Sequence, residues 1–577
     1  MKLKNAITVF VAISISLSSL HFTGSCYADK MLNAIAADNY KEFTDNGLIY
    51  NIYDDHVELV GHTEDIKENV VIPDVINNTP VTIIAEGAFE ELELLESVTI
   101  SENVTAIEDF AFCGCKKLEK IEGIKNVKSI GCDSFSFCEE LKELTLPTSI
   151  ETIGEYAFNE CKSLNSIILP DSVTDMGAGA FFKCEGLVNV KLSNNLTELK
   201  TDIDESQTPR GYYGTFGYCS SLKEIEIPES VIKIGECTFE ACSSLERISI
   251  SKNVTEIGGA AFQTAKVRTG LKIFTSPEEE LECSLKEIIV AEENESFRIV
   301  NGVLYNMDCS KLIQYPLGVY CKEFSIPKSV KIIGEGAFYD TPIEKIVFEG
   351  DVEEIRENAF GYCSNLEEIE IPESVIIIGD GAFACTSLEN IVFPKNLKQI
   401  GANAFANTRS LKNVVIPQNV ERIGFGCFYC SGLESIKILN PSLVINDEDW
   451  MTGWEICSKK DSSFNGVIYG LPDSTAQKYA EEFNCKFELL DVNYNLGDIN
   501  NNGTIDAVDA STVLAYYAMI STNKDGGFDD NQKAAADVDH DGKINAVDAS
   551  NILSYYAYVS TTKEEVMSME DFMQKAV

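Results

Sequence analysis

A short segment recurs along most of this chain at a nearly fixed period, and this repeat constrains the fold more than any other feature. Each copy has a Phe, a small residue three positions later, then Leu, alternating Ile or Val, often Pro, and a closing Ile-Gly or its equivalent, as in AFNECKSLNSIILPDSVTDMG. The anchoring phenylalanines recur at a period near 23, with two breaks: Phe89, Phe112, Phe135, Phe158, Phe181, then Phe216, Phe239, Phe262, then Phe338, Phe360, Phe383, Phe405 and Phe428. A fixed period of this length predicts a solenoid with one coil per repeat.

Within each coil, a stretch such as LKEIEIP alternates apolar and polar residues, which predicts a short half-buried strand. The Pro that follows ends the strand, because it has no N–H to donate to a ladder. Stacked coils would then pair their strands into a long parallel sheet, with the Phe and Leu side chains filling the interior.

Cysteines recur at the small position of the repeat. They are Cys115, Cys138, Cys161, Cys184, Cys219, Cys242 and Cys363, and other coils carry Ala265, Thr341, Thr386, Thr408 or Ser431 there. Side chains stacked in register about 4.8 Å apart point in parallel, whereas a disulfide needs converging Cβ atoms about 3.8 Å apart. We therefore interpret these cysteines as small buried core residues and not as disulfides or nucleophiles.

The two breaks in the repeat are where a solenoid can carry specificity. The first is an insertion around DIDESQTPRGYYG, between Phe181 and Phe216, with Arg210, Tyr212 and Tyr213 as contact candidates. The second lies between Phe262 and Phe338 and contains SFRIVNGVLYNMDCSKLIQYPLG, which predicts a hairpin. Ligand contact and plain surface insertion both stay open for each break.

Charge and histidine content exclude several classes of function. The chain has 46 basic and 92 acidic residues, so its net charge of −46 disfavours nucleic acid and other polyanions. The only histidines are His21, His56, His62 and His540, so the repeats have no imidazole for a Ser-His or Cys-His nucleophile. We identify no catalytic residue, although a carboxylate pair of the glycosidase type stays open among so many acids.

The amino terminus is typical of a secretory signal. Lys2 and Lys4 precede a short apolar stretch, and Cys26-Tyr27-Ala28 is a small-x-small cleavage site before Asp29. No later apolar run approaches the roughly 18 residues of a membrane span. The sequence predicts an exported protein without a membrane-spanning segment.

Two loops rich in Asp and Asn lie near the carboxyl end, and the second is a near copy of the first: DINNNGTIDAVD and DVDHDGKINAVD. Each places oxygen-bearing side chains at positions 1, 3, 5, 9 and 12, a Gly at position 6, and a backbone carbonyl at position 7, which is the ligand pattern of an EF-hand-type calcium loop. The predicted ligands are Asp498, Asn500, Asn502, Thr504, Asp506 and Asp509 in the first loop, and Asp537, Asp539, Asp541, Lys543, Asn545 and Asp548 in the second. Two calcium ions are expected.

The second loop has four acids among its ligands and the first has three, so we expect the second to bind calcium more tightly. Each loop is followed by a predicted helix, ASTVLAYYAMI or ASNILSYYAYV, but no helix is expected to enter either loop. Position 12 is Asp where a common EF-hand has Glu. These departures indicate a structural site and not a calcium sensor that opens.

The AF…C…L…I…IP…SV…IG rhythm resembles the BspA-like branch of the leucine-rich repeats over roughly residues 80 to 440. NGLIYNIYDDHVELVG resembles the amino-terminal cap of that family. FNGVIYGLPDSTAQKYAEEFNCKFELL resembles its closing cap, with a short helix in which Ser474 and Gln477 are placed to form a capping box. This family has diverse functions, so the resemblance leaves the function open.

The duplicated loop and helix resemble a type I dockerin over about residues 491–562, and the AVDAS…L…YYA form is similar to dockerins of fibre-degrading rumen bacteria. The resemblance implies calcium-dependent folding and docking into a cohesin module of a scaffold protein. It also implies that loop positions 10 and 11, with residues one to two turns along each helix, select the cohesin. These are Ala507, Val508, Leu514 and Ala515 in the first copy, and Ala546, Val547, Leu553 and Ser554 in the second.

The predicted organisation is therefore a signal peptide at 1–28, an amino-terminal cap at 29–80, repeats at 81–440, a closing cap at 441–490, a small all-α dockerin at 491–562 and a carboxyl-terminal tail at 563–577. The predicted function is secreted, non-catalytic recognition of a protein or glycan, anchored to a cellulosome-type scaffold. A dockerin-borne polysaccharide hydrolase and a surface adhesin are the alternatives.

Overall fold

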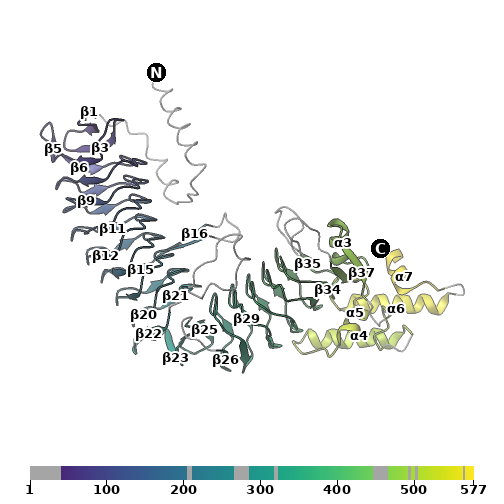
Figure 1. Ribbon diagram of the computed structural model, residues 1–577. Helices are drawn as coiled ribbons and strands as arrows, with labels where there is room; N and C mark the ends of the chain where they lie inside the picture. The colour runs from purple at the N-terminus through teal and green to yellow at the C-terminus, as the bar shows by residue number, and fades with distance from the viewer. Residues whose placement is uncertain are drawn as a thin grey trace, which may run out of the picture. The chain divides into compact units, whose positions relative to one another are not determined.

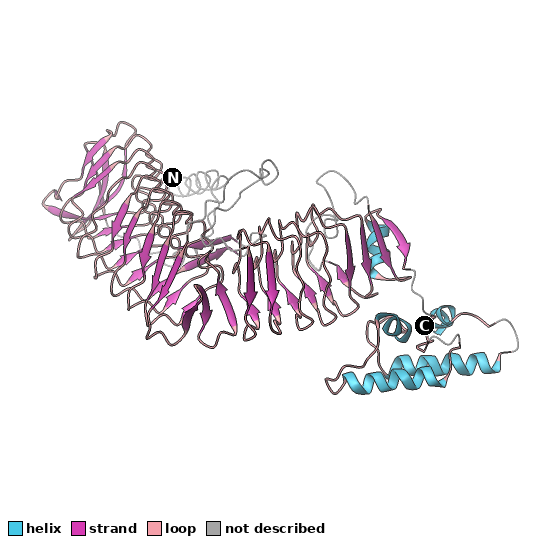
Figure 2. Cartoon of the chain, turned by 60° about the horizontal axis from the view of Figure 1, so that its bottom comes forward, coloured by secondary structure: helices cyan, strands magenta, loops and turns pink. Residues whose placement is uncertain are grey.

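The computed structural model describes residues 40–204, 211–264, 285–316, 322–445, 466–490, 495–500, 504–562 and 566–576. The chain divides into two compact units, with the division falling mainly at Ser296. Among the described residues, strands follow one another along each unit and helices appear only toward the carboxyl end (Figures 1 and 2). The predicted signal peptide lies outside the described residues.

The first unit begins with an antiparallel meander, and parallel strands then continue its sheet. One sheet runs through β1 (Lys41–Asp45), β2 (Leu48–Ile52), β3 (Val57–His62), β6 (Thr79–Ile84), β8 (Ala106–Ile107), β10 (Ser129–Ile130), β11 (Thr152–Ile153) and β13 (Asp175–Met176), with β5 (Val75–Ile76) beside β6. A further sheet follows with β15 (Glu198–Leu199), β19 (Lys233–Ile234) and β21 (Glu256–Ile257).

Most coils also contribute a strand to a second column. Over residues 69–290 these are β4 (Asn69–Val71), β7 (Ser97–Thr99) and β9 (Lys120–Glu122), then β12 (Ser166–Ile168) and β14 (Asn189–Lys191), then β18 (Glu224–Glu226), β20 (Arg247–Ile250) and β22 (Glu287–Val290). Glu287 and Ile288 of β22 group with the second unit, and the other strands belong to the first. Register partners in both columns are one repeat apart, as in Ile130 with Ile153 and Val98 with Ile121. The predicted parallel solenoid with a period near 23 is confirmed.

The second unit repeats this order. Its long sheet runs through β23 (Phe297–Val300), β24 (Val303–Asn306), β25 (Lys311–Gln314), β27 (Ile332–Ile333), β29 (Glu354–Ile355), β30 (Ile377–Ile378), β31 (Gln399–Ile400), β33 (Arg422–Ile423) and β35 (Val444–Ile445). The other column holds β26 (Glu323–Ile326) and β28 (Lys345–Phe348), then β32 (Asn413–Ile416), β34 (Ser435–Ile438), β36 (Val467–Gly470) and β37 (Lys486–Leu489). The predicted hairpin in the second break is β23 and β24.

The anchoring phenylalanines form two stacks through the core. Neighbouring rings are nearly parallel, with centroids 5.0 Å apart at Phe89–Phe112 and 6.0 Å apart at Phe239–Phe262. Phe181 and Phe216 are 5.6 Å apart although the first break lies between them in the sequence. The extra residues of the first break therefore leave the stack uninterrupted.

The seven repeat cysteines lie beside these rings with no solvent exposure. Each thiol donates a hydrogen bond to the carbonyl of the anchor Phe one coil earlier, at 3.0–3.3 Å. Thr386 and Thr408 at this position instead donate to the anchor carbonyl of their own coil, Phe383 and Phe405, and Thr341 bonds the Cys363 thiol. The position therefore takes a small side chain, which in these coils also makes a hydrogen bond, and the described cysteines are free thiols.

The first break forms a two-stranded hairpin, β16 (Thr201–Asp204) and β17 (Gly211–Gly214), that folds back on the coils of its own unit. The Tyr156 hydroxyl donates a 2.6 Å hydrogen bond to Asp202, and the Tyr213 ring meets Tyr156 and Phe182 edge-on. Arg210, and the side chain of Tyr212, lie outside the described residues, so a ligand-contact role for this break stays a prediction.

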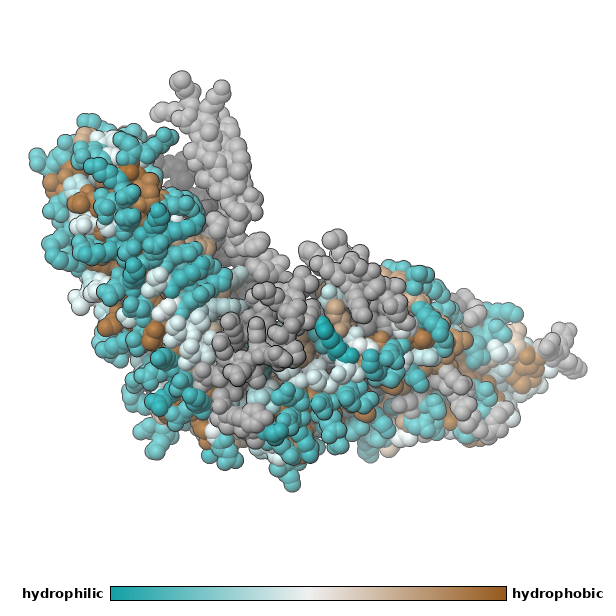
Figure 3. Space-filling model, in the orientation of Figure 1, coloured by the Kyte–Doolittle hydropathy of each residue, from teal (hydrophilic) through white to brown (hydrophobic). Residues whose placement is uncertain are grey.

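Charged side chains on the coils pair mainly with their neighbours one coil away. Lysines form ion pairs with glutamates of an adjacent coil, as Lys142 does with Glu119 and Lys398 with Glu421. Figure 3 shows hydrophilic residues over most of the visible face, with apolar residues scattered among them. Such exposed pairs add little stability, so this acidic surface is best understood as solvated.

The second solenoid closes with β36, helix α3 (Thr475–Glu482) and β37. Ser474 is the N-cap residue of α3, and its hydroxyl accepts from the Gln477 amide at 3.3 Å. The Gln477 side chain accepts from Asp473 and not from Ser474, so the predicted capping box is shifted by one residue. No helix among the described residues is long and apolar enough to cross a membrane.

Candidate metal centre

The two predicted loops lie in a small helical domain that forms the carboxyl end of the chain (Figure 2). Its main helices are α4 (Ala507–Ile520) and α6 (Ala546–Thr561), which begin at the tenth position of each loop, so that the last three loop residues form the first turn of the helix. Residues at equivalent positions of the two copies fill its core, including Ile499 with Val538 and Val513 with Ile552. The sequence duplication is therefore also a duplication of packing, and the predicted all-α fold of this region is confirmed.

The twelfth residue of each loop ties the loop to its helix. Asp509 and Asp548 are fully buried. One carboxylate oxygen accepts from the backbone of the second loop residue, at 2.9 Å for Ile499 and 3.0 Å for Val538. The other oxygen accepts from the N-cap residue, at 3.0 Å for Asp506 and 2.8 Å for Asn545. Asp therefore suits this position because a single carboxylate closes a capping box and anchors the loop.

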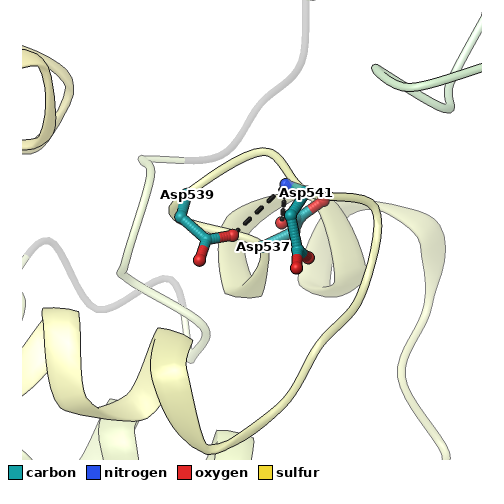
Figure 4. Close-up of side chains that lie close together, drawn as sticks. All are labelled: Asp537, Asp539 and Asp541. Carbon is teal, nitrogen blue, oxygen red and sulfur yellow. Dashed lines mark hydrogen bonds between the residues drawn. The ribbon is translucent and has the colours of Figure 1, made fainter. Parts of the chain in front are cut away.

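The second loop gathers three carboxylates. One oxygen from each of Asp537, Asp539 and Asp541 falls within 4.8 Å of the others (Figure 4). The Asp541 amide donates to Asp537 and to Asp539, both at 3.2 Å, and the Gly542 amide donates to Asp537 at 3.1 Å. Backbone N–H groups of the loop thus hold the carboxylates together.

This arrangement has an electrostatic cost that a cation relieves. Burial, with the neighbouring Asp548, raises the pKa of Asp537 to about 7, and burial raises the pKa of Asp548 to about 6. Grouped, partly buried acids favour the charged form only when a positive charge lies among them. All-oxygen donors at positions 1, 3, 5 and 12 suit a hard cation such as calcium. The Asn545 side-chain amide donates to the Lys543 carbonyl at 3.3 Å, so these two residues lie together in the loop and their role as ligands stays a prediction.

The first loop is described only in part. Asp498 is buried, and the Asn500 side chain donates to Asp509 at 2.9 Å. Asp506 is the N-cap of α4 and accepts from Val508 at 2.6 Å. Thr504 precedes this cap, and Asn502 lies outside the described residues. The structure therefore brings Asn500 and Asp509 together and leaves the rest of this ligand set a prediction.

The expectation that no helix enters either loop is wrong for the second loop. Helix α5 (Asp530–Ala536) leads directly into it, and Asp537 is the C-cap residue. Asp529 caps this helix with a capping box that includes Gln532. The helix is short and consists mostly of polar residues and Ala, so its sequence has no apolar periodicity that would predict a helix. No such helix precedes Asp498 within residues 495–500.

The predicted carboxyl-terminal tail contains helix α7 (Met569–Ala576). Met569 is buried in the domain core, and the centroid of the Phe572 ring lies 5.4 Å from that of Tyr555 and 5.3 Å from that of Tyr558. The Tyr555 hydroxyl donates to the Met567 carbonyl at 2.8 Å. The tail therefore packs on the end of α6.

The predicted partner-binding residues all lie exposed on α4 and α6. The duplication holds for their exposure: Val508 is 57% and Val547 52% exposed, and Leu514 and Leu553 are each 44% exposed. Ala507, Ala515, Ala546 and Ser554 are exposed as well.

One further pair follows the same pattern but was not among the predicted residues. Tyr517 is 40% and Tyr556 41% exposed. The Tyr-Tyr doublet of each copy could have indicated this pair, since two adjacent helical residues cannot both face the core. The first tyrosine of each doublet packs inward: Tyr516 stacks on Phe528, and Tyr555 is buried.

Comparison with known proteins agrees with this division of the chain. The family model for the BspA type leucine rich repeat region, in six copies, matches residues 82–207, 212–289 and 318–434, more than half of the chain. The model for the dockerin type I domain matches residues 496–555. No curated protein matches the chain.

Several solved structures are similar to the solenoid. A leucine rich cell surface protein from Faecalibacterium prausnitzii is 26% identical, with a TM-score of 0.46, over 71% of this chain and 91% of that one. A leucine-rich repeat protein from Bacteroides ovatus is 25% identical, with a TM-score of 0.44, over 78% of this chain and 99% of that one. From the repeats and the duplicated loop together, the chain belongs to the BspA-type leucine-rich-repeat family and carries a type I dockerin domain at its carboxyl end.

Proposed function

We propose that this is a secreted, non-catalytic recognition protein held on a cellulosome-type scaffold by calcium-dependent docking of its dockerin into a cohesin. A type I dockerin points to calcium binding and to assembly through a cohesin. The single observation that carries the docking proposal is the matched exposure of apolar side chains at equivalent positions of α4 and α6. Large apolar side chains that stay exposed in register on two packed helices are typical of a protein-binding surface.

Two calcium ions hold this surface in shape. In the second loop the ion sits among Asp537, Asp539 and Asp541, with Asp548 closing the site from the start of α6. The carboxylates of Asp509 and Asp548 already order the loop backbone, so the role of the ion is to neutralise the grouped acids and not to expose a new face. Calcium therefore acts on docking indirectly, by fixing where α4 and α6 begin.

The duplication supports two alternative docking orientations. Val508 and Leu514 of the first copy have nearly the same exposure as Val547 and Leu553 of the second, so a half-turn of the domain offers a cohesin nearly the same face. Replacing Ala507 and Val508 with Asp should leave cohesin binding intact, because the second copy still presents its pair. The matching change at Ala546 and Val547, added to the first, should abolish binding. Loss of binding from the first change alone would exclude the two-orientation model.

The solenoid supplies the recognition surface for a protein or a glycan. The net negative charge of the chain disfavours polyanionic ligands, and surface acids of the coils pair with lysines of adjacent coils. No contact on the described part of the solenoid identifies the ligand. The proposal therefore names the solenoid as a recognition module and does not name its ligand.

The test begins with purified cohesins of several types, immobilised and incubated with the full chain with and without a calcium chelator. Retention that the chelator reverses supports the docking proposal, and no retention by any cohesin in calcium contradicts it. The chain is then incubated with plant polysaccharides and with proteins. Release of soluble sugars would favour the hydrolase, whereas retention without product supports recognition.

A further inference from the structure

We propose that residues 297–490 form a second, complete recognition module with its own amino-terminal cap, so that one dockerin carries two separate leucine-rich-repeat modules. The family match describes the repeats but does not divide them into modules. This inference concerns the solenoid alone and does not depend on how the dockerin binds its partner.

The first observation is a repeated sequence at the starts of the two units. NGLIYN at residues 46–51 returns as NGVLYN at residues 301–306. In both copies Asn and Gly adopt positive φ, at 50° and 83° for Asn46 and Gly47, and at 52° and 81° for Asn301 and Gly302. Two adjacent residues in this region form the tight turn of a two-residue hairpin, which Asn-Gly favours.

The strands around the two turns also match. β1, β2 and β3 form an antiparallel meander, and β3 then pairs in parallel with β6. β23, β24 and β25 form the same meander, and β25 pairs in parallel with β27. Each meander has a register shift at the same place, between Ile49 and Tyr50 in one and between Leu304 and Tyr305 in the other.

The tyrosine after each shift serves the same purpose. Tyr50 has no solvent exposure and Tyr305 only 2%, and both are among the largest fully buried side chains of the chain. Each lies in the middle strand of its meander, at the end of the buried core. Without the meander, the apolar face of the first coil would be exposed there. The meander therefore covers the apolar end of a stack of coils in both units.

A cap in the middle of a continuous solenoid would have no role, because the preceding coil already covers the next one. A cap at residues 297–314 therefore marks the beginning of a separate stack. The described strand ladders agree, since β23 to β37 form three sheets that include no strand from β1 to β22. The second stack also has its own closing elements in β36, α3 and β37.

The two modules also differ in surface. The first carries the β16–β17 hairpin, whose Tyr213 packs against Tyr156 and Phe182 of the coils. The second keeps a nearly constant coil length throughout residues 338–428 and has no such hairpin there. Two modules with different surfaces on one chain allow two ligands to be held together, or one extended ligand to be bound with the avidity of linked sites.

The test uses the full chain in calcium and follows thermal unfolding by calorimetry. The dockerin transition is identified first as the one that a chelator lowers. Tyr305→Ala should then lower one remaining transition by roughly 10 °C and leave the other in place, because a buried aromatic is lost from one module only. Tyr50→Ala should do the reverse. Tyr305→Phe and Tyr50→Phe keep the buried ring and serve as matched controls with small shifts.

A single solenoid transition that both alanine variants lower equally would overturn the proposal. If an alanine variant does not fold, hydrogen exchange on the unmodified chain in increasing denaturant distinguishes one cooperative solenoid from two modules. Amides of β3–β21 and of β25–β37 should then exchange with two distinct opening free energies. One common opening free energy for both groups would show a single cooperative solenoid and reject the second module.

Discussion

The Cys161 thiol donates a 3.2 Å hydrogen bond to the carbonyl of Phe135, which belongs to the coil before it. Six other cysteines make the same bond at the same place in their coils. The bond joins successive coils inside the core, next to the stacked rings. Burial raises the pKa of these thiols, to about 12 for Cys115 and Cys363, so they act as neutral donors and not as nucleophiles.

We expect Cys161→Ala to cost about 1–2 kcal/mol of unfolding free energy, because it removes the donor and leaves a small void. Cys161→Thr should cost less, since Thr386 and Thr408 fill the same position with a hydroxyl that also bonds an anchor carbonyl. Urea unfolding of the two variants measures the difference. Equal losses would show that the position needs only volume.

Stability of the first solenoid should fall as pH rises from about 4 to 8. Asp133 is 5% exposed, one of its oxygens has no hydrogen-bond partner among the described residues, and burial raises its pKa to about 8. An unfolded Asp has a pKa near 3.9, so between these values only the folded state holds the proton. Each pH unit in that window then removes about 1.4 kcal/mol.

Asp133→Asn should therefore flatten the pH dependence and stabilise the first solenoid most at pH 8.5. Unfolding of both proteins by urea at pH 5.5 and pH 8.5 checks this. A difference between the two proteins that does not change with pH would contradict the assignment to Asp133.

The Tyr156–Asp202 hydrogen bond should hold the β16–β17 hairpin against the coils. Tyr156→Phe removes a bond to a charged acceptor but keeps the ring that contacts Tyr213, so we expect the hairpin amides to lose about 1–2 kcal/mol of protection against hydrogen exchange. Tyr218→Phe is the matched control, because the Tyr218 ring packs on Phe182 and the change removes no bond to Asp202. Equal protection in both variants would mean that ring packing alone holds the hairpin.

Helix α7 should stabilise the dockerin. Phe572→Ala removes a ring that packs on Tyr555 and Tyr558, and we expect a loss of about 2 kcal/mol in the dockerin transition. Lys575→Ala changes an exposed residue of the same helix and should have almost no effect. An unchanged midpoint for the Phe572 variant would show that α7 packs without contributing stability.

The two calcium loops should differ in affinity. Asp498→Asn leaves only the second loop intact and Asp537→Asn leaves only the first. Titration calorimetry should find tighter binding in the Asp498 variant, because the second loop has four acidic ligands and the first has three. Tighter binding in the Asp537 variant would show that the conformation of the loop backbone affects calcium affinity more than the number of acidic ligands does.

Much of the fold followed from the repeat, because Phe112, Phe135 and their equivalents recur at one period and each period closes one coil. The grouping of Asp537, Asp539 and Asp541 was predictable for a related reason: their spacing is local in sequence, so it is recognised without any knowledge of the fold.

The features that sequence analysis missed depend on contacts or on comparison at long range. Tyr50 and Tyr305 lie far apart in the sequence, and their shared role becomes visible only when both are seen to be buried in matching meanders. The exposure of Tyr517 and Tyr556 depends on which tyrosine of each doublet faces the core. Helix α5 is too short for a periodic signal and exists because Asp529 and Gln532 cap it.

The position of each anchor phenylalanine in the core does not depend on the length of its coil. Phe181 and Phe216 are as close as the rings of coils without an insertion, although the segment between them has grown by a hairpin. The chain accommodates extra residues at this turn because the next anchor phenylalanine returns to the stack. A coil can therefore gain new surface while the packing of its neighbours stays the same.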